Sequence, residues 1–452
     1  MPSSRILLAL AALAAGPAAA AAPITLDEAL ALAARSNLDL RLAGNDRSGA
    51  EVDAYGSYAG VLPRLDLQAQ FGNQYSAYGQ QITIAPVQIN PVAYEKLIVP
   101  TPAVDFESYL FGLQLSLPLF DGFTSWARIA QSEALSRAAA RQYDEAALAT
   151  AANVIALFYE VVRAEKSRAV LDEAARRSGE LVRRTDALYQ AGRAARADTY
   201  AARVTLGNDR IAVEQQSARL AEARVALSLG LGREADPDLR VVAPEALEAP
   251  VFLDPPPLAE LLELAKARRP VVAAGQERLR AAAEDVRAAQ GGYWPAVSAQ
   301  ASYVRQSPWL YGTFGAYGDP TQQYVATVGV NVNWNLFEGR ATSAAVQRAR
   351  VGRERAELAA QQAVQQLTSE VARARSSYVT LVRSSAIAEE NLRAAQENLR
   401  LAKVRFEAGA ATQLEITDAL LKLTQAELAL LGARVDAIVA RADLNRAVGG
   451  AL

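Results

Sequence analysis

The residues whose types and spacing could do chemistry stand just after a turn near the end of the chain. Glu415 and Asp418 follow the sequence Gly409-Ala-Ala-Thr412 and are three residues apart, so in a helix they share one face. The chain contains no Cys and no His, which excludes thiol catalysis, His-based acid–base catalysis, disulfides and the usual zinc sites. A carboxylate pair is the only catalytic chemistry that remains, and no substrate pocket is evident beside it. We therefore interpret the chain as a non-enzyme that uses no cofactor and no metal ion.

A closely similar turn occurs earlier, where Ala191-Gly192 matches Ala408-Gly409 at an offset of 217 residues. A glycine at this place suits the left-handed position that ends a helix. Apolar residues recur in heptads before and after both turns, for example Leu206, Val213 and Leu220. The sequence thus predicts two long coiled-coil helical hairpins, with tips near 191–197 and 408–414.

The first 22 residues have the pattern of a secretory signal peptide. Arg5 supplies the basic start, residues 6–15 the apolar run, and residues 18–22 the small side chains of a cleavage region, with cleavage after Ala20 or Ala22. The run is too short for a membrane anchor, and we find no later run of about 18 apolar residues, so no transmembrane helix is expected after it. The 47 basic and 49 acidic residues are mixed along the chain, which points to no nucleic-acid partner.

Four stretches alternate apolar and polar residues with the period of a half-buried strand, and the pattern before the first of them predicts a helix from Thr25 to about Gly60. A long polar, Pro-containing loop is expected at about 73–107, between the first two strands. The four predicted strands are about 64–76, 108–118, 296–306 and 322–336.

The second half of the chain repeats the first. The helical pattern from Leu258 matches that from Leu26 at an offset of 232, as Trp294-Pro295 matches Leu62-Pro63. Leu336-Phe-Glu-Gly339 matches Leu119-Phe-Asp-Gly122 at an offset of 217. We expect a first repeat at 23–231, a Pro-rich linker at 232–257 and a second repeat at 258–452.

Four strands cannot close a barrel, yet each would have one apolar face. Open strands of this kind are unstable in water and are excluded from lipid unless every edge is paired. Three chains would supply twelve strands, an even number typical of outer-membrane barrels, with apolar side chains toward lipid and polar ones toward a wet lumen. A soluble sandwich is disfavoured because long helices interrupt the strands, and a diffusion porin because porins build the barrel from one chain.

The order, duplication and spacing of these motifs resemble the TolC family of outer-membrane efflux and secretion channels over the whole mature chain. The motifs are Thr25-Leu-Asp-Glu-Ala29, the paired X-Pro steps, the paired Leu-Phe-acidic-Gly steps and the two Ala-Gly tips. The resemblance implies a homotrimer, mainly α with membrane β, in which a 12-stranded β-barrel in the outer membrane joins a 12-helix α-barrel in the periplasm of a Gram-negative bacterium.

The resemblance also implies a function and partners. The chain would be the exit channel of a tripartite efflux pump or a type I secretion system, a passive conduit gated at its periplasmic aperture. Its partners would be an inner-membrane pump of RND or ABC type, a periplasmic adaptor (membrane fusion) protein and outer-membrane lipid. The alternative is that the chain is itself a periplasmic helical-hairpin adaptor. An adaptor would have one hairpin flanked by compact β domains, and the sequence predicts none.

Several residues at the tips take roles from this resemblance. Glu415 and Asp418 match the acidic residues that ring the aperture, where six carboxylates from three chains would favour cations; the alternative for both is an ordinary solvated helix face. Asp198 matches an acidic position in contacts that close the aperture. Phe406 stands where Tyr is common in the family, so a hydroxyl hydrogen bond is lost there. Arg193 and Arg196 flank the first tip, in position to pair with acidic groups of a neighbour. The expected turn and adaptor-docking residues are Gly192, Gly409, Ala411 and Thr412.

Overall fold

The structure, a computed structural model, describes most of the chain. The described residues are 23–76, 82–84, 87–89, 92–94, 97–99, 104–244, 247–248, 250, 252–321, 324–408 and 410–451. The predicted signal peptide, 1–22, and the tip residue Gly409 lie outside the described residues.

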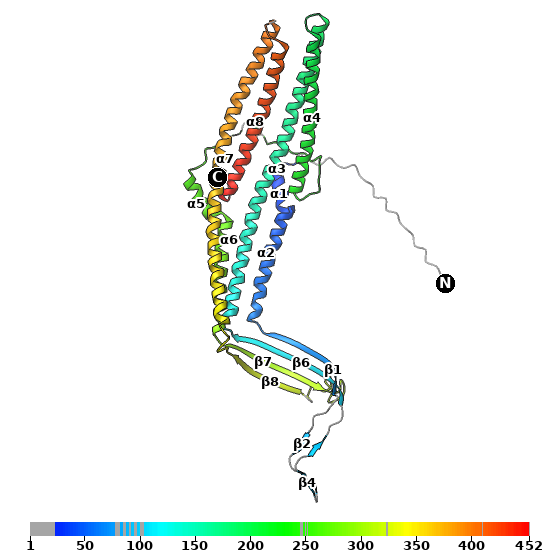
Figure 1. The fold of residues 1–452 in the computed structure, drawn as a ribbon, viewed down its shortest axis with the longest axis vertical. Coiled ribbons are helices and arrows are strands. Elements are labelled where there is room, and N and C mark those ends of the chain that lie inside the picture. The colour runs from blue at the N-terminus through cyan, green and yellow to red at the C-terminus, as the bar shows by residue number, and fades with distance from the viewer. Residues whose placement is uncertain are drawn as a thin grey trace, which may run out of the picture. The chain divides into compact units, whose positions relative to one another are not determined.

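Helices make up most of the described chain, as the heptad patterns predict (Figure 1). The two longest helices, α3 and α7, have 67 residues each and lead to the two tips. Two short 3₁₀ turns, Tyr58–Gly60 and Gly291–Tyr293, follow α2 and α6. The α-helices are α1 (Leu26–Ser36), α2 (Leu38–Ser57), α3 (Thr124–Gln190), α4 (Arg196–Gly230), α5 (Leu258–Arg268), α6 (Pro270–Gln290), α7 (Ala341–Glu407) and α8 (Gln413–Val448).

The first helical segment is not continuous, contrary to the prediction of one helix up to about Gly60. It begins with a capping box between Thr25 and Glu28. The hydrogen bonds of the Glu28 carboxylate with the backbone and side chain of Thr25 lower the pKa of Glu28. It is then broken at Asn37. The Asn37 side chain accepts a hydrogen bond from the Leu40 N–H at 3.0 Å and donates one to the Gly230 carbonyl at 2.8 Å. The side chain therefore ends α1 and caps the start of α2.

Four strands form one antiparallel sheet in the order β1-β6-β7-β8. Their bounds are β1 Arg64–Ser76, β6 Val104–Phe120, β7 Ala296–Ser307 and β8 Tyr324–Asn333. The expected loop at 73–107 contains two short strand pairs, so the prediction of a loop is wrong for them. They are β2 (Ile82–Ile84) with β5 (Leu97–Val99), and β3 (Val87–Ile89) with β4 (Val92–Tyr94).

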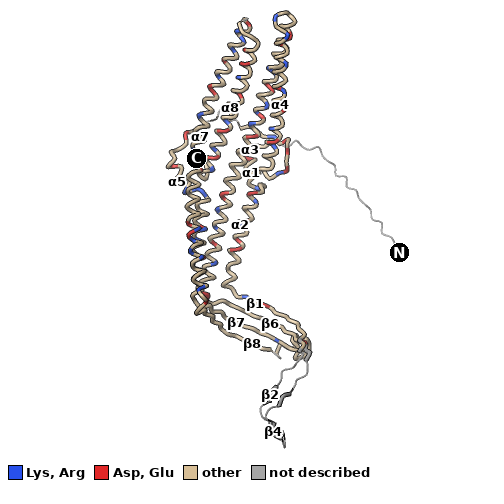
Figure 2. The backbone as a smooth tube through the Cα atoms, viewed as in Figure 1, with Lys and Arg blue, Asp and Glu red and all other residues tan. Residues whose placement is uncertain are grey.

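The register of this sheet gathers apolar residues on one face and mostly polar ones on the other. Leu67 pairs with Leu113, which pairs with Tyr303, while Asp66 pairs with Gln114 on the opposite face. The apolar face is uncovered along β1 and β8, where Leu65, Leu67, Phe71, Val328, Val330 and Val332 are between 61% and 86% exposed. The strands also carry few charged residues, whereas both signs are scattered along the helices (Figure 2). This sheet presents to its surroundings the kind of surface that soluble sheets bury.

The Leu-Phe-acidic-Gly motifs are the corners where a strand of the sheet turns into a long helix. Asp121 accepts hydrogen bonds from the Ser125 N–H at 2.8 Å and the Ser125 hydroxyl at 2.5 Å, and so caps α3. Gly122 has a φ of +69°, and an added Cβ would lie 2.4 Å from the Gly291 carbonyl oxygen. At the second corner Glu338 accepts a hydrogen bond from the Thr342 hydroxyl at 3.0 Å. The motifs connect β6 to α3 and β8 to α7, at the same end of the sheet at which β1 and β7 begin after α2 and α6, so the β1–β6 and β7–β8 connections lie at the other end.

The chain divides into two compact units, one built around the sheet and one built from helices. The helical unit comprises Met1–Ser48, Ala138–Gln276 and Ala359–Leu452, and the sheet unit Gly49–Arg137 and Glu277–Leu358. In the helical unit Phe158, Val161 and Leu227 are fully buried in one cluster, and Val371 and Leu444 lie in another.

One 18-residue window of α3 is apolar enough, by length and composition, to cross a membrane. The prediction that no transmembrane helix follows the leader stays a prediction, because length and composition alone do not assign a membrane span. A third of this window is buried within the chain, at 33%. The test is also passed by core helices of soluble proteins, so it assigns no membrane span to α3.

The two corner glycines form a matched pair for testing the strand-to-helix turn. We expect Gly122→Ala to lower the heat-denaturation midpoint clearly, because left-handed strain of about 1–2 kcal/mol adds to overpacking of about 1–3 kcal/mol. Gly339→Ala carries only the strain, since its φ is +56° and no described atom lies within 4 Å of the added Cβ. Circular dichroism of the purified proteins in mild detergent measures both midpoints. Equal losses in the two variants would contradict the close packing assigned to the first corner.

Candidate functional site

The second tip is held by Glu415, which serves as the partner in a capping box. Thr412 caps α8, the Glu415 N–H donates to the Thr412 hydroxyl at 3.4 Å, and the Thr412 N–H donates to the Glu415 carboxylate at 3.3 Å. Arg405, in the last turn of α7, lies 3.4 Å from the same carboxylate and donates to the Ala410 carbonyl at 3.2 Å. The charge of Glu415 is thus tied to the turn between α7 and α8.

Asp418 follows one turn later on α8 and pairs with Lys422 at 2.7 Å. The side chains of Glu415 and Asp418 are 42% and 51% exposed, so both reach solvent at the tip. The structure therefore brings the two predicted carboxylates together at one end of α8. It also places one cation beside each, which sequence reasoning did not include. The field of this pair is weaker than that of two bare carboxylates.

The first tip has a related construction, and there Arg203 of α4 pairs with Asp186 of α3 at 3.3 Å. Gly192 has the expected left-handed conformation, with a φ of +71°. The Asp198 carboxylate accepts a hydrogen bond from the Ala195 N–H at 3.1 Å, so it caps its own helix, α4. Arg196 contacts Tyr200 on α4, with its Nη2 3.2 Å from the hydroxyl, and the Arg193 side chain is exposed. The expected pairing of these arginines with a neighbouring chain stays a prediction.

Phe406 contacts the other hairpin. The Arg184 guanidinium of α3 lies over the Phe406 ring at 5.2 Å from its centroid, and Arg184 is 3.6 Å from Glu407. A cation–π contact of this kind needs the ring face and no hydroxyl. The structure thus gives Phe406 a role between α3 and α7 within one chain. Whether a latch between chains is lost with the hydroxyl stays a prediction.

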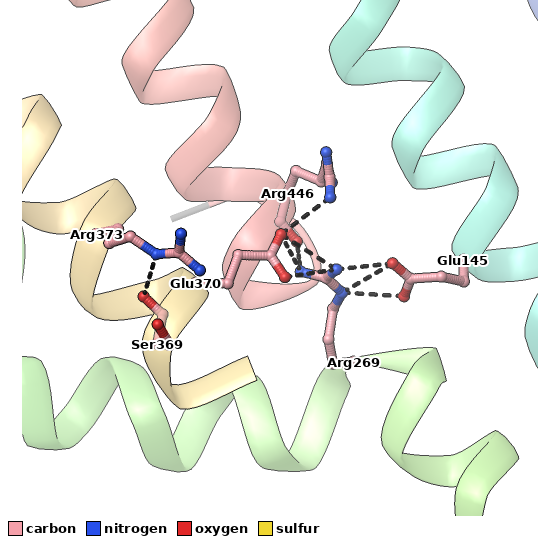
Figure 3. Close-up of polar contacts among 6 residues, drawn as sticks. All are labelled: Glu145, Arg269, Ser369, Glu370, Arg373 and Arg446. Atoms are coloured by element: carbon pink, nitrogen blue, oxygen red, sulfur yellow. Dashed lines mark hydrogen bonds and ion pairs between the residues drawn. The ribbon is translucent and has the colours of Figure 1, made fainter. Parts of the chain in front are cut away.

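Further from the tips, a buried arginine joins three helices at the break between α5 and α6 (Figure 3). Arg269 is 3% exposed and contacts Glu145 of α3 at 2.7 Å and Glu370 of α7 at 3.3 Å. It also donates to the Arg446 carbonyl near the end of α8 at 2.8 Å, while the Arg446 side chain lies 3.0 Å from Glu370. The cluster ties helices from the two halves of the chain to one point.

The ionisation of this cluster follows from burial and from its charges. Burial alone would lower the pKa of Arg269, but the hydrogen bond and charge of Glu145, followed by those of Glu370, outweigh it and raise that pKa. The neighbouring Asp443 has its pKa raised by burial, although the charge of Arg446 opposes this and that of Glu370 adds to it. The cluster therefore keeps Arg269 charged in a place where an isolated cation would be costly.

Sequence reasoning missed this cluster, although a signal was present. Arg269 follows Asn37 at the repeat offset of 232, and both residues break a helix. Asn37 donates to the Gly230 carbonyl at the end of α4, as Arg269 donates to the Arg446 carbonyl at the end of α8. The second repeat has the charged Arg269 where the first repeat has the neutral Asn37. This difference indicates that Arg269 has an oppositely charged partner.

Comparison with known proteins assigns the chain to a family. The sequence model of the outer membrane efflux protein family matches residues 29–233 and 261–450, which is most of the chain. This protein belongs to the outer membrane efflux protein family.

Similar proteins and a similar structure agree with this assignment. Outer membrane protein OprJ of Pseudomonas aeruginosa is 29% identical over 192 residues, 42% of this chain and 38% of OprJ. Protein CyaE of Bordetella pertussis is 31% identical over 274 residues, 58% of this chain and 55% of CyaE. Both matches thus span less than two thirds of the relatives' lengths. The CmeC outer membrane channel of Campylobacter jejuni has the same fold, with a TM-score of 0.77 at 18% identity, over 94% of this chain and 85% of CmeC.

Membership confirms the resemblance to TolC-type channels and the location in the outer membrane. It favours a channel over the periplasmic adaptor and a transport protein over an enzyme. The mainly helical fold with a small antiparallel sheet is confirmed as well.

The buried cluster gives a prediction about the helical unit. We expect Arg269→Ala to lower the heat-denaturation midpoint strongly, because removal of one member of a buried ion pair costs about 3–5 kcal/mol by leaving the others uncompensated. The double variant Arg269→Ala/Glu145→Ala should recover part of this loss.

A suitable control is Arg393→Ala, since Arg393 pairs with Glu389 at 2.7 Å but is 75% exposed. An exposed pair contributes at most about 1 kcal/mol. The account of the cluster is wrong if both arginine variants unfold at the same temperature.

Proposed function

We propose that three copies of this chain form a closed 12-stranded barrel in the outer membrane, continued by a 12-helix tunnel in the periplasm. The observation that supports this is the four-stranded sheet with one exposed apolar face and its outer edges at β1 and β8. In lipid such edges must be paired, and closure with two further copies would pair them. Each of the two repeats, 23–231 and 258–452, would supply two strands and one helical hairpin.

The trimer would act as a passive exit duct of a tripartite efflux pump or a type I secretion system. An inner-membrane pump of RND or ABC type would deliver the substrate, and a periplasmic adaptor would dock at the hairpin tips. Gly192, Ala411 and Thr412 stand at the described tips for this contact, and Gly409, the fourth residue expected to take part, lies outside the described residues. The family assignment, and the fold shared with an outer membrane channel, support this proposal.

The tips of α7–α8 would line the periplasmic aperture. Three copies of Glu415 and Asp418 would place six carboxylates around it, each with a cation from its own chain, Arg405 or Lys422. Because these cations offset the charge of the carboxylates, the cation preference that a bare ring of six carboxylates would give is reduced to a modest one. Breaking the pair between Glu415 and Arg405 would loosen the turn as well as change the charge.

Ion selectivity in planar bilayers tests the proposed aperture. We expect the purified wild-type protein to form conducting pores with a cation preference. In Glu415→Gln/Asp418→Asn the reversal potential under a salt gradient should shift toward anion selectivity, because the ring loses its carboxylates and keeps the cations Arg405 and Lys422. Gln at position 415 keeps the capping-box hydrogen bond from the Thr412 N–H and loses only the ion pair with Arg405, so α8 keeps its cap.

Glu173→Gln on α3 removes an exposed carboxylate that pairs with Arg176, and should leave the selectivity unchanged. Wild-type and double-variant proteins that reconstitute yet never conduct would contradict the channel. If the wild-type and double-variant pores conduct with the same selectivity, Glu415 and Asp418 do not line the aperture, and the proposed channel is unaffected.

A further inference from the structure

The apolar face of the sheet contains one arginine, which the proposed function leaves unexplained. Arg305 of β7 pairs with Phe111 of β6 and Tyr324 of β8, and it follows Tyr303 on the same face. A charged side chain on a lipid-facing strand is destabilising unless its polar atoms are satisfied. Arg305 is 4% exposed, so something covers it.

The cover is the described part of the connection between β7 and β8, residues 308–321, which we call the aromatic loop. Arg305 donates hydrogen bonds to the Gly318 and Gly315 carbonyls, each at 2.8 Å. Tyr303 donates from its hydroxyl to the Pro320 carbonyl at 2.5 Å. Because both side chains stand on the apolar face, the aromatic loop folds back over that face.

The aromatic loop has a definite internal structure. The Ala316 N–H donates to the Trp309 carbonyl at 2.8 Å, and the Tyr317 N–H donates to the Leu310 carbonyl at 2.9 Å. An added Cβ on Gly318 would lie 1.7 Å from the Gly312 carbonyl oxygen, so the loop closes tightly on itself. Its position on the sheet is therefore set by the sequence of the loop as well as by Arg305.

The aromatic loop presents ring side chains outward and leaves an apolar groove beneath. Trp309, Tyr311, Phe314 and Tyr317 are between 52% and 72% exposed. The groove, of about 530 Å³, lies between loop and sheet, and its lining includes Ala69, Phe71, Phe111, Leu310 and Tyr317. Tyr317 meets the edge of the Phe111 ring with centroids 6.1 Å apart.

We propose that the aromatic loop is a lipid-binding collar at the outer-leaflet boundary of the membrane, with its groove occupied by a lipid acyl chain. Trp and Tyr favour the level of the lipid headgroups, where their rings meet apolar chains and their polar atoms meet water. The loop lies at the end of the sheet opposite the helices, hence at the outer surface if the helices are periplasmic. The groove is continuous with the exposed apolar rows of the sheet, which favours lipid as its occupant. This inference rests on the proposed membrane barrel.

Tryptophan fluorescence tests the proposal, because Trp309 is the one Trp of four that lies in the aromatic loop. Trp126→Phe/Trp294→Phe/Trp334→Phe keeps Trp309, and Trp126→Phe/Trp294→Phe/Trp309→Phe keeps Trp334 at the helix end of β8. Each full-length variant is reconstituted into phosphatidylcholine vesicles with acyl chains brominated near the headgroup or near the chain end. We expect Trp309 to be quenched, and more strongly by bromine near the headgroup. Trp334 reports independently whether the sheet lies in the bilayer.

Gly318→Ala, added to the Trp309 variant, should push the aromatic loop off the sheet, so that quenching falls and the emission moves to longer wavelength. Gly329→Ala in β8 is the matched control, since no described atom lies within 4 Å of its added Cβ. Quenching of Trp334 without quenching of Trp309 overturns the collar and leaves the barrel intact. Absence of quenching at both positions overturns the barrel and the collar together. If the quenching of Trp309 is unchanged in Gly318→Ala, the aromatic loop does not lie on the sheet as described, and the proposal is overturned.

Discussion

The structure depends on a sheet that one chain cannot complete. Its four strands join apolar side chains into continuous rows on one face, and along β1 and β8 those rows are exposed. Water penalises such a face, and lipid excludes the unpaired backbone groups at its edges. The proposed closure with further copies in a membrane would relieve both penalties. The corners at Asp121 and Glu338 connect this sheet to α3 and α7, whose apolar seams are buried against other helices.

Within the helical unit, polar groups determine where long helices break and meet. Asn37 and Arg269 stand at corresponding breaks, and each binds a carbonyl near the end of a returning helix. The neutral break makes local contacts, whereas the charged one also connects Glu145 and Glu370 from the two halves of the chain. Polar side chains also fix the helix ends at the tips, where the carboxylates of Glu415 and Asp198 accept hydrogen bonds from backbone N–H groups at the start of α8 and α4. Each of these carboxylates caps a helix at a tip, and the tip is also the surface at which the proposed partner or ion would bind.

The sequence predicted those parts of the fold that depend on periodicity. Alternation located the strands and heptads located the hairpins, because both patterns follow directly from which side chains face an apolar surface. The break at Asn37 was missed because a capping side chain continues the polar pattern of the helix. The Arg269 cluster was missed because its members are far apart in sequence and meet only through tertiary packing. The structure places Glu415 and Asp418 near the turn between α7 and α8, and their role at an aperture stays a prediction; the cations beside them depend on the conformation of that turn. The folded-back aromatic loop has no sequence period, and its position depends on Arg305 and on close contacts between glycines.

The native mass of the mature protein in mild detergent tests the central claim most directly. The account predicts a trimer that is extracted from the outer membrane and that separates into single chains on heating. A monomer found in the soluble periplasmic fraction would contradict it, since an exposed apolar sheet with open edges would then persist in water.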